Sequence, residues 1–357
     1  MKASFVSNLA VQNAMRLTIQ RGQVEMMKLN DEVSTGVHAD YGLALGTSTS
    51  RSVNISSQLD RLATLKSTNS IVNQRLSGSQ EALKTMQDAA QKALNSLTTF
   101  RDNSTADLLK IAQGQNKAAM STFTSAANTS LNGEYLFSGI NTDVQPFTEY
   151  SATSAAKASY DAALSSFITA QPVQVPPLTS VTQFTKAQMT DFIENKLAPM
   201  YEDPSVPGSQ WADWSDASSQ NMTSRISANE VIQSSTNLNT EGARKFALAS
   251  IVSSELLSAG LSDEVRGAVT GKAIEYMGAA VTGLISMQSN LGLSQERVKK
   301  ANTSIDAQTK IIKANQLDLE GIDTFAASTM LKTLQTQLET SYTLTSRLQQ
   351  LSLINFL

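Results

Sequence analysis

The sequence predicts a mainly α-helical protein whose N- and C-terminal segments form a long antiparallel helical bundle, like a coiled-coil rod. A small mixed α/β insert domain is expected at the distal end of this rod. Three observations indicate the fold: a heptad pattern in each half of the chain, and a change of composition between them. Because a helix has 3.6 residues per turn, residues seven positions apart stay on one side of it.

The heptad pattern near the C-terminal end is unbroken. A column of large apolar residues consists of Met277, Leu284, Leu291, Val298, Ile305, Ile312 and Leu319. At about 1.5 Å per residue, the predicted helix runs roughly 60 Å. A helix of this length needs a partner along its apolar stripe.

The second heptad pattern, over residues 53–100, supplies that partner. Its seam positions are Leu62, Leu65, Asn69, Val72, Leu76, Ser79, Leu83, Met86, Ala90, Ala93, Leu97 and Phe100, of which two are polar. Burying one Leu contributes about 1.5–3 kcal/mol, so the paired seams stabilise a central bundle. Ser104 or Thr105 is expected to cap a further helix. Asn132-Gly133 predicts a turn that leads into a strand.

The region between the two patterns has a different composition. Residues 141–225 hold both tryptophans, Trp211 and Trp214, and five of the seven prolines lie between Pro172 and Pro204. We interpret this region as an insert with its own small hydrophobic core around the tryptophans. Its predicted short helices are 155–167 and 186–200, and its predicted strands are 173–175 and 222–231.

The two ends of the chain predict shorter amphipathic helices. Residues 4–34 carry one apolar face and close at Gly36, and a final helix carries Leu331 to Leu351. Residues 42–50 have the composition of a flexible connector. Because short amphipathic helices are marginal alone, we expect both ends to be disordered in the monomer and to order against neighbouring subunits. The expected domains are 1–50 with 313–357, 51–140 with 226–312, and 141–225.

Composition excludes several kinds of function. A net charge of −3 over 357 residues offers no basic field for nucleic acid, and no apolar run is long enough for membrane insertion. With no cysteine and one histidine, thiolate sites, a histidine-based triad and a two-histidine metal site are excluded. We therefore expect no enzyme activity, no catalytic residues, no cofactor and no metal.

One glycine-containing segment superficially resembles a phosphate-binding loop. Gly267 to Ala273 reads Gly-Ala-Val-Thr-Gly-Lys-Ala, with three residues between the glycines where four are needed and no hydroxyl residue after the lysine. Small residues that allow close helix packing are the preferred interpretation of this segment.

The candidate functional residues are those of a subunit or partner interface. The polar positions beside the Met277 column have two interpretations, a solvent-facing edge or a contact whose amides fix the register between subunits. The apolar residues of the two terminal helices are the other candidates. The full set is Val6, Leu9, Leu17, Val24, Gln288, Gln295, Asn302, Leu338, Tyr342, Leu348, Leu351, Leu353 and Phe356.

Several segments resemble the bacterial flagellin family. Asn8 to Gln12 and Leu29 to Gly36 are similar to the family's N-terminal helix, and Leu291 to Val298 resembles its C-terminal long-helix signature. Asp318 to Asp323 stands where the family has an acidic break. The resemblance covers both ends of the chain, roughly 1–147 and 224–357, and leaves the insert unaligned.

Two further segments resemble the hook–filament junction branch of this family more than its filament-forming branch. They are Asn132 to Gly139, which reads Asn-Gly-Glu-Tyr-Leu-Phe-Ser-Gly, and the ending Leu351 to Leu357. In one departure, Ala39-Asp40-Tyr41-Gly42 replaces the family's Asp-Asp-Pro or Asp-Asp-Ala element. This departure keeps a filament flagellin open as the alternative.

The resemblance implies a structural protein of the bacterial flagellum, located outside the cell at the hook–filament junction. The segment Met1 to Val6 lacks the features of a secretory leader, so the implied export is through the flagellar system without a cleaved signal peptide. The implied partners are other copies of the chain in a ring or tube, the other hook-associated protein, flagellin, and an export chaperone on the C-terminal helix. A secreted coiled-coil adhesin or a chaperone is the more distant alternative.

Overall fold

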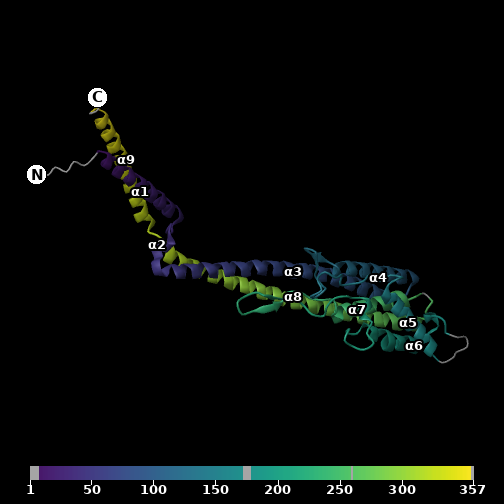
Figure 1. The fold of residues 1–357 in the computed structure, drawn as a ribbon. Coiled ribbons are helices and arrows are strands. Elements are labelled where there is room, and N and C mark those ends of the chain that lie inside the picture. Colours follow the sequence, from purple (N-terminus) through teal and green to yellow (C-terminus); the bar gives the residue numbers. More distant parts are fainter. Residues whose placement is uncertain (1–7, 172–177, 259, 355–357) are drawn as a thin grey trace. The chain divides into compact units, whose positions relative to one another are not determined.

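The computed structural model describes residues 8–171, 178–258 and 260–354, and these residues are mainly helical (Figure 1). They fall into two compact units. The first unit holds the described residues up to Thr64 and those from Ser304 onward, and the second holds Leu65 to Thr303. The division into three domains expected from the sequence stays a prediction.

In the first unit, the terminal helices α1 (Asn8–Thr35) and α9 (Thr324–Ile354) pack against each other. They run antiparallel, since the Gly36 carbonyl after α1 accepts from the Ile322 N–H before α9 at 3.1 Å, while Gly22 lies against Leu338. The Gln23 amide donates to the Tyr342 hydroxyl at 2.7 Å. As predicted, α1 ends at Gly36, whose φ of +75° suits a residue without a Cβ.

The prediction of a flexible connector at 42–50 is wrong. Helix α2 (Tyr41–Leu45) and a 3₁₀ turn (Gly46–Ser48) fill most of this segment, and the next helix already begins at Thr49. The Asp40 carboxylate caps α2 by accepting from the Leu43 backbone N–H at 3.0 Å. This cap stabilises the first turn of α2, although the composition of the segment favours a loop.

The two long helices are α3 (Thr49–Asp102) and α8 (Asp263–Glu320). Within the second unit they lie antiparallel, because Asn69 bonds to Asn302 and Gln295 bonds to Ser77. The seam positions of α3 from Asn69 to Phe100 are all buried, as are Met277, Leu284, Leu291 and Val298 of α8. The heptad prediction is confirmed.

The chain turns from α3 into α4 (Ala106–Ala127), which Thr105 caps as predicted. Strands β1 (Ser130–Leu131) and β2 (Glu134–Tyr135) form a hairpin. Its two turn residues, Asn132 and Gly133, have φ of 54° and 85°, which is the left-handed conformation that an Asn-Gly hairpin needs.

The insert consists of short elements. They are α5 (Ala155–Ala170), α6 (Lys186–Asp191), a π turn (Phe192–Leu197), 3₁₀ turns at Val181–Gln183, Ala198–Tyr201 and Trp211–Asp213, and strands β3 (Thr223–Arg225) and β4 (Val231–Gln233). The strand predicted at 222–231 is a two-stranded hairpin, and the predicted strand 173–175 lies outside the described residues. Helix α7 (Glu241–Ile251) and a π turn (Val252–Leu256) then lead to α8.

An aromatic core holds the insert together. Trp211 and Trp214 are buried, as predicted, and both rings contact Phe147. Phe147 in turn contacts Phe123 of α4, which stacks on Phe246 of α7. The insert core is therefore continuous with the core of the helices beside it.

Candidate assembly interface

The outer side of α1 carries large apolar side chains that nothing in the described chain covers. Leu17 is 53% exposed, and Val24 and Met27 are each 62% exposed. Spacings of seven and three residues place them on one side of the helix. We call Leu17, Val24 and Met27 the α1 stripe. Exposed apolar stripes of this kind mark surfaces that another polypeptide covers.

Helix α9 adds exposed apolar residues of its own. Phe325 is 82% exposed and Met330 is 62% exposed, and the sequence reasoning named neither of them. They carry no motif. Their exposure follows from which side of α9 packs on α1, and one helix alone does not reveal that side.

The structure separates the predicted residues of the terminal helices into two groups. Leu17 and Val24 are open to a partner, whereas Leu338 is 7% exposed and packs on Gly22 inside the helix pair. Tyr342 is partly exposed and bonded to Gln23. Leu9, Leu348, Leu351 and Leu353 lie in α1 and α9 but their side chains are outside the described ones, as are Val6 and Phe356 altogether.

The predicted polar seam faces α3 of the same chain. Gln288 accepts at its backbone carbonyl from the Gln80 side chain at 2.7 Å, Gln295 donates to Ser77 at 3.1 Å, and Asn302 accepts from Asn69 at 2.8 Å. All three residues are half-buried. In this structure, the amides fix the register between α3 and α8 within one subunit.

A corner of buried carboxylates joins the terminal helices to the ends of the long helices in the first unit. Glu320 is 4% exposed and accepts a hydrogen bond from the Ser52 hydroxyl, while its carbonyl accepts from the His38 N–H at 3.0 Å. Glu32, 7% exposed, accepts from the Ala39 N–H at 3.1 Å. His38 lies beside Glu32 at 3.7 Å, so the single histidine is part of this corner.

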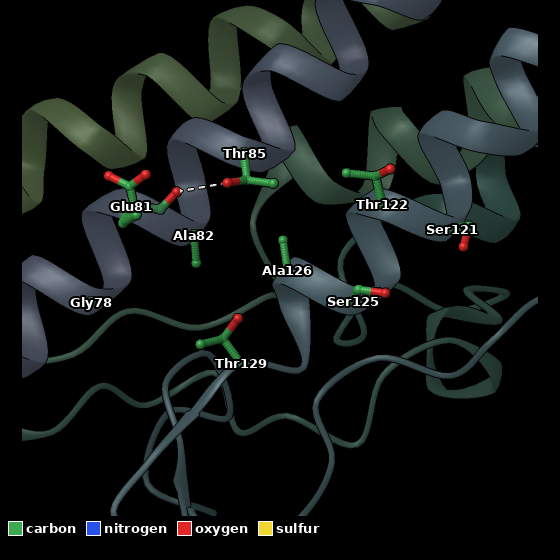
Figure 2. Close-up of a pocket in the computed structure, with 9 residues that line it drawn as sticks. All are labelled: Gly78, Glu81, Ala82, Thr85, Ser121, Thr122, Ser125, Ala126 and Thr129. Carbon is green, nitrogen blue, oxygen red and sulfur yellow. Dashed lines mark hydrogen bonds between the residues drawn. The ribbon is translucent and has the colours of Figure 1, made fainter.

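Two open grooves lie on the described surface. One, of about 620 Å³, runs between α1 and α9 beside Gly22 and Leu338. The other, of about 590 Å³, lies between α3 and α4 (Figure 2). Its lining is Gly, Ala, Ser and Thr except for Glu81, and the Thr85 hydroxyl bonds back to the Glu81 carbonyl. No histidine or lysine is among the described residues that line this groove.

Within residues 8–171, 178–258 and 260–354, no three His, Cys, Asp or Glu side chains gather as metal ligands. No helix in the same described ranges is long and apolar enough to cross a membrane. The Gly267–Gly271 segment lies inside α8, with nothing within 4 Å of a Cβ built at either glycine. The close packing predicted for these glycines is therefore wrong.

Comparison with known proteins decides the family. Residues 6–142 match the bacterial flagellin N-terminal helical region, and residues 274–357 match the bacterial flagellin C-terminal helical region. The two matches together cover more than half of the chain. The chain belongs to the bacterial flagellin family. It is thus a structural, non-enzymatic protein of the extracellular flagellum, in a family that self-assembles.

A solved structure described as a flagellar hook-associated protein from Vibrio parahaemolyticus has the same fold. The two chains share 10% sequence identity with a TM-score of 0.52, over 76% of this chain and 97% of the other. Among curated protein sequences, none matches significantly.

Proposed function

We propose that this flagellin-family protein is the hook–filament junction protein, which adapts the hook to the filament by subunit packing. The α1 stripe carries the assembly part of the proposal, because three large apolar side chains on one helix face are left open in the isolated chain. The junction role is supported by the resemblance of Asn132 to Gly139 and of the C-terminal end to the junction branch.

In this proposal, the terminal helices of neighbouring copies pack together as a ring or tube. The other hook-associated protein binds on one side of the assembly and flagellin on the other. Before export, a chaperone covers the C-terminal helix, which shields its apolar side chains from aggregation. The division of the chain into core-type ends, bundle and outer insert belongs to the same proposal.

A gene deletion tests the junction role. We expect hooks without filaments, with flagellin released into the medium, because the filament lacks its attachment point. If the protein were instead a filament flagellin, its deletion would leave no flagellin to be released into the medium. The protein would also be present in very many copies per flagellum. Hooks that still carry filaments would contradict the proposal.

Substitution within the α1 stripe tests the interface. Val24→Asp places a charge where an apolar contact is proposed, so we expect export to continue while filament attachment is lost. Val24→Leu keeps a large apolar side chain at the same position and serves as the matched control. Filament attachment is scored by electron microscopy. Equal attachment in both strains would show that the α1 stripe is not part of the interface.

A further inference from the structure

Asn69 is a fully buried polar residue at a seam position of α3. Ser79, the other polar seam residue, satisfies its hydroxyl on the Arg75 carbonyl of its own helix at 3.0 Å. Asn69 makes its bonds to other segments. A buried amide costs several kcal/mol if it is left without partners, so its bonds restrict where those segments can lie.

Both hydrogens of the Asn69 amide have acceptors. Nδ2 donates to Asn302 Oδ1 of α8 at 2.8 Å and to the Ile226 carbonyl at 2.9 Å. Ile226 directly follows β3 and is fully buried. One side chain therefore ties together α3, α8 and the β3–β4 hairpin.

The hairpin depends on such anchoring. β3 and β4 pair over three residues each, and an isolated two-stranded hairpin is marginally stable at best. Beyond Asn69, the Arg297 side chain of α8 pairs with Glu230 in the hairpin turn at 2.7 Å, but this pair is exposed and solvent screening weakens it. The Asn69 hydrogen bond is the stronger attachment because it is buried and shielded from solvent.

We propose that Asn69 is a positioning residue that seats the β3–β4 hairpin across the long helices and specifies their register. The hydrogen bond from Asn69 to Asn302 in this seam can form in one register only, while purely apolar positions tolerate a shift by a heptad. This inference concerns the folded monomer and does not depend on the junction role.

The hairpin part is tested by Asn69→Asp in the full chain. The carboxylate keeps the shape but replaces the donor with oxygens that face the Ile226 carbonyl and Asn302 Oδ1. We expect amides in 223–233 to exchange with deuterium at least tenfold faster, with exchange in 83–100 unchanged. Asn73→Asp, at an exposed position one turn away, is the control. Exchange that rises equally everywhere, or nowhere, would overturn the proposal.

The register part is tested by disulfide trapping, which is clean because the chain has no cysteine. Ser77→Cys with Gln295→Cys reports the observed register, and Ser77→Cys with Gln288→Cys reports a shift of one heptad, about 10 Å. We expect only the first pair to cross-link with Asn69 in place. With Asn69→Leu and Asn302→Leu together, the second pair should cross-link as well.

The double leucine variant keeps the proposal testable if Asn69→Asp fails to fold. Replacing both members of a buried polar pair by apolar residues of similar size is tolerated in protein cores. Hairpin exchange should still rise in this variant, because the Ile226 carbonyl has lost its donor. An unchanged hairpin together with an unchanged cross-linking pattern would show that Asn69 positions neither segment.

Discussion

At the scale of single residues, one glycine pair decides how closely α7 approaches α8. A Cβ built on Gly283 would lie 2.4 Å from the Gly242 Cα, and one built on Gly242 would lie 2.8 Å from the Gly283 carbonyl carbon. Both contacts are with backbone, which cannot rotate out of the way. The crossing therefore requires glycine on both helices, although glycine weakens a helix by about 0.5–1 kcal/mol.

Alanine substitution at two glycines of α8 gives a matched prediction. Gly283→Ala should lower the free energy of unfolding by about 1–3 kcal/mol, because the helices must separate to admit the methyl group. Gly278→Ala, where a Cβ meets nothing within 4 Å, should raise it by up to about 1 kcal/mol through helix propensity. Urea denaturation followed by circular dichroism measures both. A stabilised Gly283→Ala would contradict the close approach.

A second residue-scale prediction concerns the buried Glu320. Ser52→Ala removes the hydroxyl that donates to this carboxylate. Leaving a buried acceptor without its donor costs about 1–3 kcal/mol. We therefore expect α1 and α9 to become more sensitive to protease at their junction with the long helices. Ser50→Ala, at an exposed site on the same helix, should leave the cleavage rate as it is.

At the scale of elements, tyrosine side chains hold the insert together through contacts with the tryptophan rings and through hydrogen bonds. Tyr150 stacks on Trp214 and donates to the Glu255 carboxylate at 2.9 Å, and Tyr201 also contacts Trp214. Burial is the main cause that raises the pKa of Tyr150, Tyr160 and Tyr201 above the ordinary tyrosine value. For Tyr150, the bond to Glu255 raises the pKa further.

These raised pKa values predict loss of stability in alkali. Unfolded tyrosine titrates near pH 10, so stability is fully present below about pH 10 and falls as pH rises above it. We expect the urea midpoint reported by tryptophan fluorescence to decrease over that range. Tyr150→Phe should reduce the slope, since it removes one group whose pKa differs between the folded and unfolded states. A midpoint that does not depend on pH would contradict the assignment.

At the scale of the whole molecule, the two units differ in how much of their apolar surface is covered. The second unit has a continuous core from the α3 seam to the insert aromatics. The first unit leaves the α1 stripe and Phe325 open, and its terminal helices have one another as partners. Less burial per residue means easier local opening.

This difference predicts the order of proteolysis in the free chain. Protease should cut first within the terminal helices and leave a resistant fragment that contains Leu65 to Thr303. A chain trimmed to residues 50–312 should keep its helix content per residue in circular dichroism. Early cleavage inside the insert, or a large loss of helix on trimming, would contradict the expectation that the ends order only in the assembly.

Much of the fold was predictable because heptad periodicity is a local property. The seam of α3, the Met277 column, the cap at Thr105 and the Asn132-Gly133 turn each depend on residues a few positions apart. The same reasoning failed at 42–50, where composition suggested a loop and the Asp40 cap favoured a helix. It also placed close packing at Gly267 and Gly271, when the crossing with α7 occurs at Gly283.

The candidate interface was only partly predictable. Leu17 and Val24 could be identified from helical spacing, but whether their face or the opposite face packs on α9 depends on the partner helix. Leu338 has the same chemistry and faces inward. Phe325 and Met330 belong to no sequence pattern, so only their exposure in the folded chain revealed them.

By itself, the sequence determined the helical class, the two long seams and the resemblance to flagellins. Each of these depends on residue spacing or on short motifs, which are local properties of the chain. Tertiary structure alone decided that the polar seam turns toward α3, that Asn69 joins three segments, and that Glu32 and Glu320 are buried at one corner. These contacts join residues far apart in sequence. A periodic pattern shows that a helix face needs a partner, and only packing shows which partner it has.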